Sequence, residues 1–588
     1  MPAAQTSTRQ FDAVVISASR TEQRLVDALP HVTLITREEI ESSQAPDALT
    51  LLARLAGVET AQVGGIGRQA GIFLRGSSTR HTLVLIDGVP INNLNFSAAA
   101  LEHVLAAQID RIEVVRGNVS ALYGSQAVGG VIQIFTRTGQ SEPGASARVE
   151  AGSRDTLGGD LAVHGAVGDW RYAASASTFK TAGFNAIDQG KRPGTNPDQD
   201  GYENFAASGQ LAYTWLPGQE LGVRAFHSRG EVEYDSEFGP ATQADESRQT
   251  VDAASVWSRN RLASWWTWQI TVAKQRDDLD ADITAFPFFV TSDGTQFAWQ
   301  HDFTLAADWT ASLAAERLEQ KIDSDSAYTT NERSVNTARA GTIGRAGAHQ
   351  VQLGVRHDDY SDFGSATTYF AGYGLTLAEV WKLTASLSSA FNAPTFNDLH
   401  SPFGGNPNLQ PEKTRAAELG VQYANDKTLA RLALFRTRYR DLIGLDASFN
   451  AVNIGRAMVE GAEAALSTLL ADWQVRLALT AQNAKDDTSG ERLVRRARHF
   501  GSLHVGRDFG RYEAHATWRA TGDRTDRFAG TTRRLNAYSV LDLAARYRFG
   551  KHVAVFARAE NVFDKQYENA FGYNVAGRGF FGGIEARL

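Results

Sequence analysis

Residues 511–519 read Arg-Tyr-Glu-Ala-His-Ala-Thr-Trp-Arg, and apolar and polar side chains alternate through this stretch. Successive side chains of a β-strand point to opposite faces, so Tyr512 and Trp518 share one face while Glu513 and Arg519 share the other. A strand with one apolar and one charged face fits between lipid and a polar lumen, as in a transmembrane barrel. A soluble β-sandwich gives the same alternation, so this stretch alone leaves both folds open.

The alternation persists far beyond this stretch. It recurs at residues 541–549 and 580–588, and the whole region 138–588 shows no second domain signature. At roughly 20 residues per strand with its connections, this region predicts a transmembrane β-barrel of about 22 antiparallel strands. A barrel of that size needs a plug in its lumen.

The region before the barrel has a mixed pattern. Thr36 followed by Glu39 predicts a helix start, and leucines at helical spacing in residues 46–55 predict a helix that Gly57 ends. Short strand-like runs follow at Gly71–Leu74, Thr82–Ile86, Arg111–Val115 and Val131–Phe135. The sequence therefore predicts an α+β plug domain within the barrel lumen.

The domain boundaries follow from where these patterns change. The mixed pattern gives way to sustained alternation near residues 137–144. We predict an N-terminal tail at 1–18, a plug domain at 19–137 and the barrel at 138–588. The first residues lack the charged and apolar segments of a signal peptide, so we interpret the chain as a mature form without its leader.

Composition limits the function classes. The 53 glycines, 30 phenylalanines, 16 tyrosines and 11 tryptophans favour a β-protein with many turns and aromatic girdles. The absence of cysteine excludes thiolate catalysis, disulfides and zinc–cysteine sites. The net charge of −7 comes from well-mixed acidic and basic residues, without the basic stripe of a nucleic-acid-binding protein. No catalytic triad or phosphate-binding helix motif stands out, so we do not predict an enzyme.

Several motifs resemble the TonB-dependent receptors of the gram-negative outer membrane. In the plug they are, in order and at the family's spacing, residues 51–58 (LLARLAGV), 72–76 (IFLRG), 84–89 (VLIDGV), 112–117 (IEVVRG) and 121–132 (ALYGSQAVGGVI). In the barrel they are residues 405–412 (GNPNLQPE) and 560–567 (ENVFDKQY). The resemblance covers essentially the whole chain. It implies active import powered by the TonB C-terminal domain with ExbB and ExbD. The C-terminal Leu588 departs from the aromatic residue usual in such barrels, which concerns the assembly signal and not the fold.

Within this family the chain most resembles cobalamin transporters. The likeness lies in residues 12–18 (DAVVISA), 64–67 (GGIG) and 570–578 (AFGYNVAGR). It implies import of cobalamin or a related corrinoid, which a periplasmic binding protein then receives. Haem and ferric-siderophore import are alternatives. Haem receptors of this family place a histidine ahead of the 405–412 motif and join it to one on the plug apex, and the histidines available here are His400, His81 and His103.

Other members of the family, and other classes of protein, give different expectations. Energy-coupled signal transducers carry an additional periplasmic domain ahead of the tail, whereas only eleven residues precede Asp12 here. A passive porin has no plug, and a soluble adhesin or β-rich enzyme has no lipid-facing aromatic girdle.

The tail contains a segment that resembles a TonB box, made of Asp12, Ala13, Val14, Val15, Ile16, Ser17 and Ala18. A short β-prone segment outside the plug can add as a strand to the edge of a partner's sheet, so that main-chain bonds transmit a pull. We expect it to be periplasmic and loosely held at rest. The alternative is an ordinary frayed first strand.

Two apical segments of the plug are predicted to contact the substrate. Their residues are Gly64, Gly65, Ile66, Gly67, Arg68, Asn92, Asn93 and Asn95. The asparagines can meet the amides of a corrin ring. The glycine-rich segment could be taken for a phosphate cradle, but no helix of the dinucleotide-binding type follows it.

The resemblance implies two charged sites. Arg75, Arg116, Glu418 and Glu463 match a cluster that family members place between plug and barrel, where buried charges persist only when paired. Asn185, Asp198, Asp200, Asp235 and Glu246, or Asp245 in its place, fall where cobalamin transporters bind calcium, which takes six to eight oxygen ligands. Asn185 stands where another aspartate is expected. The alternative for both sets is ordinary solvated charge.

Overall fold

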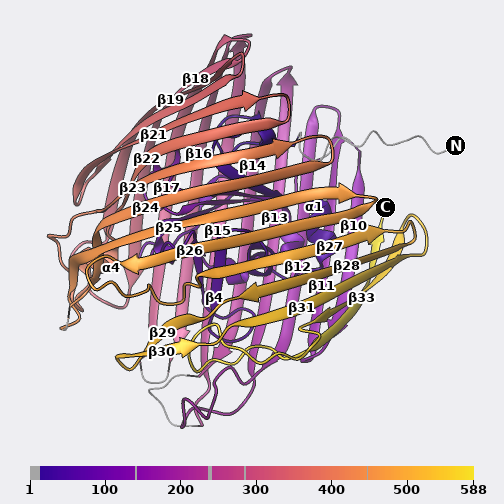
Figure 1. Cartoon of the computed structure of the whole chain (residues 1–588), viewed down its shortest axis with the longest axis vertical. Coiled ribbons are helices and arrows are strands. Elements are labelled where there is room, and N and C mark those ends of the chain that lie inside the picture. The colour runs from indigo at the N-terminus through magenta and orange to yellow at the C-terminus, as the bar shows by residue number, and fades with distance from the viewer. Residues whose placement is uncertain (1–12, 140–141, 236–241, 284–285, 447) are drawn as a thin grey trace.

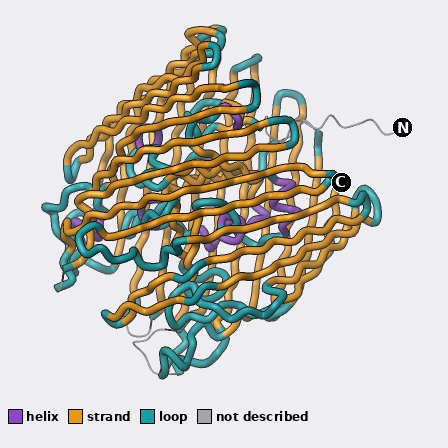
Figure 2. The backbone as a smooth tube through the Cα atoms, in the orientation of Figure 1, coloured by secondary structure: helices purple, strands orange, loops and turns teal. Residues whose placement is uncertain are grey.

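The computed structural model describes residues 13–139, 142–235, 242–283, 286–446 and 448–588. Within these residues, 22 antiparallel strands close into a barrel. Figure 1 shows the first part of the chain inside this barrel, and Figure 2 shows the plug helices within the wall of strands. The predicted 22-stranded barrel with an N-terminal plug is confirmed. In the described ranges, no helix combines the length and the apolar character needed to cross a membrane.

The barrel strands pair in chain order, and β33 pairs with β10 to close the wall. The first half comprises β10 (Gly144–Gly152), β11 (Thr156–Val167), β12 (Trp170–Phe184), β13 (Asp200–Leu216), β14 (Gln219–Tyr234), β15 (Asp245–Ala263), β16 (Trp266–Asp282), β17 (Phe288–Ala306), β18 (Trp309–Ser324), β19 (Glu332–Ala346) and β20 (His349–Tyr360). The second half comprises β21 (Gly364–Leu377), β22 (Trp381–Asn392), β23 (Glu412–Ala424), β24 (Thr428–Leu445), β25 (Ala451–Leu470), β26 (Trp473–Asp486), β27 (His499–Asp508), β28 (Tyr512–Thr521), β31 (Tyr538–Arg548), β32 (Val553–Glu560) and β33 (Gly579–Arg587).

Tight turns alternate with longer loops around the barrel. Residues 168–169 join β11 to β12, whereas residues 185–199 join β12 to β13. Outer-membrane barrels have short periplasmic turns and longer extracellular loops, which orients the molecule. The extracellular loops include α4 (Phe396–His400) and a hairpin of β29 (Arg524–Phe528) and β30 (Thr531–Leu535). Figure 1 shows both at the end of the barrel away from the C-terminus.

The outer surface of the barrel carries the apolar face of each strand. In β28, Tyr512 and Trp518 are 61% and 45% exposed, whereas His515 and Thr517 are buried on the inner side. Exposed aromatic side chains beside the tight turns are Trp170, Trp215, Trp265, Trp381, Trp473, Tyr512 and Phe549. This is the aromatic girdle of a membrane interface, and it excludes the soluble sandwich.

The plug is built on a sheet in the order β3-β8-β9-β6-β7. Its strands are β3 (His31–Ile35), β6 (Thr82–Ile86), β7 (Val89–Pro90), β8 (Ile109–Arg116) and β9 (Gly130–Thr136). Two smaller sheets pair β1 (Val14–Val15) with β2 (Gln23–Arg24) and β4 (Val58–Gln62) with β5 (Ala70–Leu74). The helices are α1 (Arg37–Ser43), α2 (Ala48–Leu52), α3 (Ser120–Tyr123) and the 3-10 turns η1 (Leu25–Asp27), η2 (Thr79–His81), η3 (Leu101–His103) and η4 (Ala106–Gln108).

Local signals placed most plug elements correctly. Thr36 caps α1 by accepting a hydrogen bond from the N–H of Glu39, as predicted. The four predicted strands correspond to β5, β6, β8 and β9. The helix predicted at 46–55 is shorter than expected because it ends at Leu52, after which the chain turns toward the barrel at Gly57.

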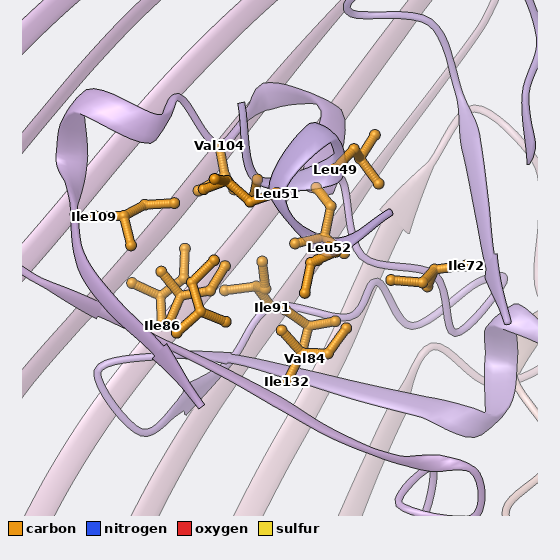
Figure 3. Packing of buried hydrophobic residues seen from close by; sticks show 14 of the residues in the cluster. Leu49, Leu51, Leu52, Ile72, Val84, Ile86, Ile91, Val104, Ile109 and Ile132 are labelled. Carbon is orange, nitrogen blue, oxygen red and sulfur yellow. The ribbon is translucent and has the colours of Figure 1, made fainter. Parts of the chain in front are cut away.

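The plug core lies between α2 and the sheet. Figure 3 shows Leu49, Leu51 and Leu52 of α2 close to Val84 and Ile132 of the sheet. All five side chains are at most 5% exposed. Each such side chain contributes roughly 1.5–3 kcal/mol on burial, which makes this half of the plug a rigid body. The apical loops and the tail extend from it.

Candidate functional site

The segment predicted to be a TonB box, called the box below, is docked against the plug. The described residues begin at Ala13, so Asp12 lies outside them. Val14 and Val15 pair with Arg24 and Gln23 in a two-stranded sheet. Val15, Ser17 and Ala18 are fully buried. The expectation of a loosely held segment is therefore wrong for residues 14–18 in this state.

Glu113 of β8 holds this segment. Its Oε2 accepts hydrogen bonds from the N–H of Ile16 at 3.0 Å, the N–H of Ser17 at 3.0 Å and the Oγ of Ser17 at 2.8 Å. Arg111 Nε donates to its other oxygen at 3.1 Å. The Tyr123 hydroxyl donates to the carbonyl of Ser17 at 3.0 Å. The box is therefore tied to the plug sheet by a buried carboxylate that sequence patterns did not reveal.

The end of the box and the segment after it are attached to the barrel wall through their carbonyl oxygens. Gln352 donates to Ala18 O at 2.9 Å and Lys382 donates to Val26 O at 2.6 Å. Arg431 of β24 donates to the carbonyls of Val32 and Leu25 at 2.6 and 2.8 Å. The wall thus fixes residues 25–32 through their main-chain carbonyl groups. Every residue has such a carbonyl group, so these contacts cannot be predicted from the sequence.

Arg75, Glu418 and Glu463 meet between plug and barrel. The guanidinium of Arg75 forms two 3.0 Å hydrogen bonds with Glu463 and a third with Glu418. It also lies 4.7 Å from the ring centroid of Phe435. Glu463 is completely buried. A Cβ at Gly57, where φ is +70°, would collide with the Glu463 carboxylate, so only glycine lets the plug approach this closely.

Arg116 and His31 complete this cluster. Arg116 Nη2 donates to Thr33 in the adjacent plug strand, and burial lowers the pKa of Arg116 to about 10. His31 Nδ1 lies 3.4 Å from Glu463. Burial, followed by the charge of Arg116, lowers the pKa of His31 to about 3, so this imidazole is neutral at physiological pH. No sequence pattern indicates this role for His31.

The predicted apical asparagines mostly shape their own loop. Asn92 accepts from the N–H of Val84 at 2.8 Å and donates to two backbone carbonyls. Asn93 accepts from the N–H of Phe96, and Asn95 donates to the hydroxyl of Tyr328 at 3.3 Å. Phe96 itself is 51% exposed at the tip of this loop. An exposed aromatic ring there was not predicted, because nothing in the sequence distinguishes it from a core phenylalanine.

The other apical segment borders a cavity. Gly64, Gly65 and Ile66 line a space of about 220 Å³ together with barrel residues that include Arg558 and Tyr567. The loop after β32 also borders this space through Val575–Gly577. The segment 570–578 and the segment 64–67, which are separate motifs in sequence, therefore border one cavity.

Arg68 extends from the plug into the acidic loops predicted to bind calcium. Its Nη1 lies 3.5 Å from Asp200 Oδ1 and donates to the carbonyl of Glu233. Burial, together with the charges of Asp200 and Asp198, raises the pKa of Asp235 to about 7. The Oδ2 of Asp235 is buried without a hydrogen-bond partner. A cationic side chain thus stands among these carboxylates.

The remaining predicted calcium ligands are engaged elsewhere. Asn185 Oδ1 accepts from the N–H of Ile187, and Asp198 accepts from Asn196. Glu246 is exposed and lies 3.4 Å from Arg248, whereas Asp245 is buried on the opposite face of β15. In the part of the chain that the structure describes, no three carboxylate or imidazole side chains are arranged to hold a metal ion. The residues as placed do not fit bound calcium.

The three histidines considered for haem are buried. His81 pairs with Glu412 at 2.6 Å and His103 lies 3.0 Å from the Tyr202 hydroxyl. Burial lowers the pKa of His103 to about 4. His400 is 8% exposed and lies 3.2 Å from Thr329 Oγ1. None of the three imidazoles is presented to a ligand in the described structure.

Comparisons with known proteins agree with this architecture. Residues 24–131 match the TonB-dependent receptor plug domain, and residues 145–562 match the family described as TonB dependent receptor-like, beta-barrel. Similar curated proteins include the vitamin B12 transporter BtuB of Photobacterium profundum, 28% identical over 97% of this chain and 94% of that protein. The BtuB of Vibrio vulnificus is also 28% identical, over 98% of this chain and 95% of that protein.

Solved structures show the same fold. The siderophore receptor PirA from Acinetobacter baumannii superimposes with a TM-score of 0.83, at 19% identity, over 95% of this chain and 98% of PirA. The ferric enterobactin receptor PfeA from Pseudomonas aeruginosa gives 0.82 at 20% identity, over 98% of this chain and 100% of PfeA. The motif series, the plugged barrel and the two family matches lead to one conclusion: the chain belongs to the TonB-dependent receptors of the outer membrane.

Proposed function

We propose that this receptor imports cobalamin or a related corrinoid across the outer membrane. TonB, with ExbB and ExbD, supplies the energy by pulling on the segment around Val14–Ser17, and a periplasmic binding protein receives the ligand. The choice of substrate rests on the whole-chain similarity to proteins named vitamin B12 transporters. The likeness to siderophore receptors, at 19–20% identity, concerns the fold alone.

The apical surface offers side chains that suit a large ligand rich in amides. Phe96 offers an exposed ring for stacking against a planar macrocycle, and Asn95 with Tyr328 supplies neighbouring polar groups. The buried histidines give haem no axial ligand in this state. Haem and ferric siderophores are included in the test as the competing ligands.

The test is titration of the purified receptor with cyanocobalamin, with and without calcium, beside haem and ferric enterobactin. Saturable binding of cyanocobalamin alone is expected. Binding of haem or ferric enterobactin with no binding of cyanocobalamin in either condition contradicts the proposal.

The titrations with and without calcium test whether the predicted calcium site exists. Calcium at Asp198, Asp200 and Asp235 stays a prediction, and it requires Arg68 to leave the cluster. Ordering of the loops by the ion would lower the entropic cost of ligand binding. If cobalamin binds equally well with and without calcium, the proposed substrate is retained and the predicted calcium site is rejected.

A further inference from the structure

Two cavities lie along one side of the plug, against strands β12–β20. The periplasmic cavity, of about 590 Å³, is lined by Gly218 and Arg261 at the tight-turn end of the barrel. The inner cavity, of about 110 Å³, reaches Pro394 and Thr395 just ahead of α4, at the extracellular end. Both are lined by Arg20, Gly88 and Tyr123. They therefore meet and together follow the seam between plug and barrel through the depth of the molecule.

Arg20 closes the junction between the two cavities. Its Nη1 contacts Glu316 of β18 at 2.9 Å and the carbonyl of Leu122 in the plug at 3.1 Å. Its guanidinium lies 5.2 Å from the ring centroid of Tyr123. Gln300 donates to its carbonyl oxygen at 3.2 Å. One side chain thus bridges the plug and the barrel wall where the two cavities adjoin.

The position of Arg20 in the chain makes this closure movable. Its N–H donates to the carbonyl of Ile16 at 2.8 Å, so Arg20 ends the turn that follows the box. Gln352 of the wall holds the carbonyl of Ala18 ahead of Arg20, and residues 25–32 are fixed to the wall beyond it. A pull on Val14–Ile16 therefore first breaks the bonds of Ile16 and Ser17 to Glu113 of the plug sheet, and Arg20, two residues beyond the box, then moves before residues 25–32.

The inner cavity is lined by three glutamines beside the charged side chains of Arg333, Arg356 and Glu316. Gln275, Gln296 and Gln320 come from the neighbouring strands β16, β17 and β18. Gln275 Oε1 is buried without a hydrogen-bond partner, and Gln296 Nε2 has only a long 3.5 Å contact with Glu316. The glutamine side chains can exchange hydrogen bonds with a passing ligand that carries amides, while Arg356 and Glu316 are already paired with each other.

A second seam on another side of the plug differs in chemistry. That cavity, of about 150 Å³, lies against strands β24–β27 and is lined by Leu429, Ala465, Ser467 and Leu477. Its lining is mostly aliphatic, and Arg431 anchors the tail beside it. Arg54, Arg116, Arg476 and His504 also border it, and Leu25 and Val32 of the wall-bound segment line it from the plug side.

From this geometry we infer that the ligand crosses to the periplasm along the β16–β20 seam and that Arg20 is the residue that closes it. The inference rests on the proposed import function for its ligand, but the closure itself is a property of the chain. The three glutamines of this seam suit a ligand that is rich in amide groups.

The closure is tested without any ligand, because the chain contains no cysteine and a single introduced thiol is a clean reporter. Gln296→Cys in the purified receptor is labelled with a small methanethiosulfonate reagent, alone and combined with Arg20→Ala. Arg20→Ala should raise the labelling rate at least fivefold. The matched control is Glu22→Ala, which removes an exposed charge two residues away that pairs with Arg259. A rate that rises equally with both changes, or with neither, overturns the inference.

The route is tested by obstruction in cells that depend on this receptor for cyanocobalamin uptake. Gln296→Trp should lower uptake at least tenfold while leaving cyanocobalamin binding unchanged, because the bulky ring fills the seam. Ser467→Trp, in the second seam, should leave uptake within twofold of wild type. Equal uptake by both variants, or loss only in Ser467→Trp, overturns the route. If the wild-type receptor binds no cyanocobalamin, the proposed substrate is contradicted instead. The thiol-labelling measurement then tests on its own whether Arg20 closes the seam.

Discussion

Glu113 Oε2 accepts both the N–H of Ser17, at 3.0 Å, and the Oγ of Ser17, at 2.8 Å. These residues lie 96 positions apart, in the tail and in strand β8 of the plug. The bond occupies the N–H of Ser17, which a partner strand would need in order to pair with the box. Under the proposed function, release of Ser17 from this carboxylate precedes coupling to TonB.

Glu113→Ala should free the box in the absence of ligand. Three hydrogen bonds to a charged acceptor are lost, and each is worth roughly 1.5–3 kcal/mol. A loss of even about 2 kcal/mol shifts the docked population by roughly thirtyfold. Spin labels at Val14 should become mobile. Arg111→Ala is the control because Arg111 contacts Glu113 but not the tail. Equal mobility in the two variants would show that Glu113 does not hold the box.

Glu463→Ala should loosen the plug within the barrel. It leaves Arg75 and Arg116 buried with one fewer counter-charge, and breaking a buried pair costs about 3–5 kcal/mol. Glu460→Ala on the same strand breaks an exposed pair with Arg436 and should cost less than about 1 kcal/mol. Hydrogen exchange of β3 and β5 measures both. Unchanged protection in Glu463→Ala would mean that this cluster does not secure the plug.

Glu102 should make the plug less stable as pH rises. Burial, with the nearby charges of Asp277 and Asp47, raises the pKa of Glu102 to about 8. An unfolded glutamate has a pKa of about 4.3, so the folded plug binds more protons between these values. Stability is therefore lost as pH rises from about 4 to about 8. Glu102→Gln should abolish this part of the loss.

The measurement for Glu102 is hydrogen exchange of residues 99–105 at pH 6 and pH 9, corrected for the intrinsic rate. Protection at pH 9 relative to pH 6 should be higher in Glu102→Gln than in wild type. The same pH response in both proteins would show that Glu102 is not protonated in the folded plug.

Phe96→Ala should weaken ligand binding about tenfold, the loss expected from one aromatic stacking contact of roughly 1.5 kcal/mol. Phe96 is exposed, so its removal should leave the fold unchanged. Phe403→Ala, which removes another exposed ring from the loop after α4, is the control. Calorimetry with cyanocobalamin measures both, and an unaltered affinity in Phe96→Ala would exclude this ring from the ligand site.

Elements with strong local signals were predictable. The period of two in residues 511–519 reports one face in lipid and one in the lumen, and Thr36 marks the start of α1 through a contact three residues away. The strands β5, β6, β8 and β9 read as short apolar runs bounded by turn residues. The charged residues between plug and barrel could be named only through the family resemblance.

Contacts between distant segments were not predictable. In the sequence, Glu113 is one polar position among others in a strand. Only the folded structure shows that it binds the N–H of Ile16 in the tail. Asn92 was assigned to the ligand, yet its amide completes backbone hydrogen bonds of its own loop. Arg68 was grouped with the substrate-binding residues, but it lies among the carboxylates predicted for calcium. In each case the partner is fixed by chain geometry and not by residue type.

Uptake of labelled cyanocobalamin by cells carrying wild-type receptor or Val15→Pro tests the central claim most directly. Proline removes the N–H that a partner strand needs, while Val15→Ala keeps it and serves as control. At equal outer-membrane levels, Val15→Pro should bind cyanocobalamin normally and import no more than cells lacking TonB, whereas Val15→Ala should import it. Import by Val15→Pro at the wild-type rate, or no TonB-dependent cyanocobalamin uptake by the wild type, would contradict the account.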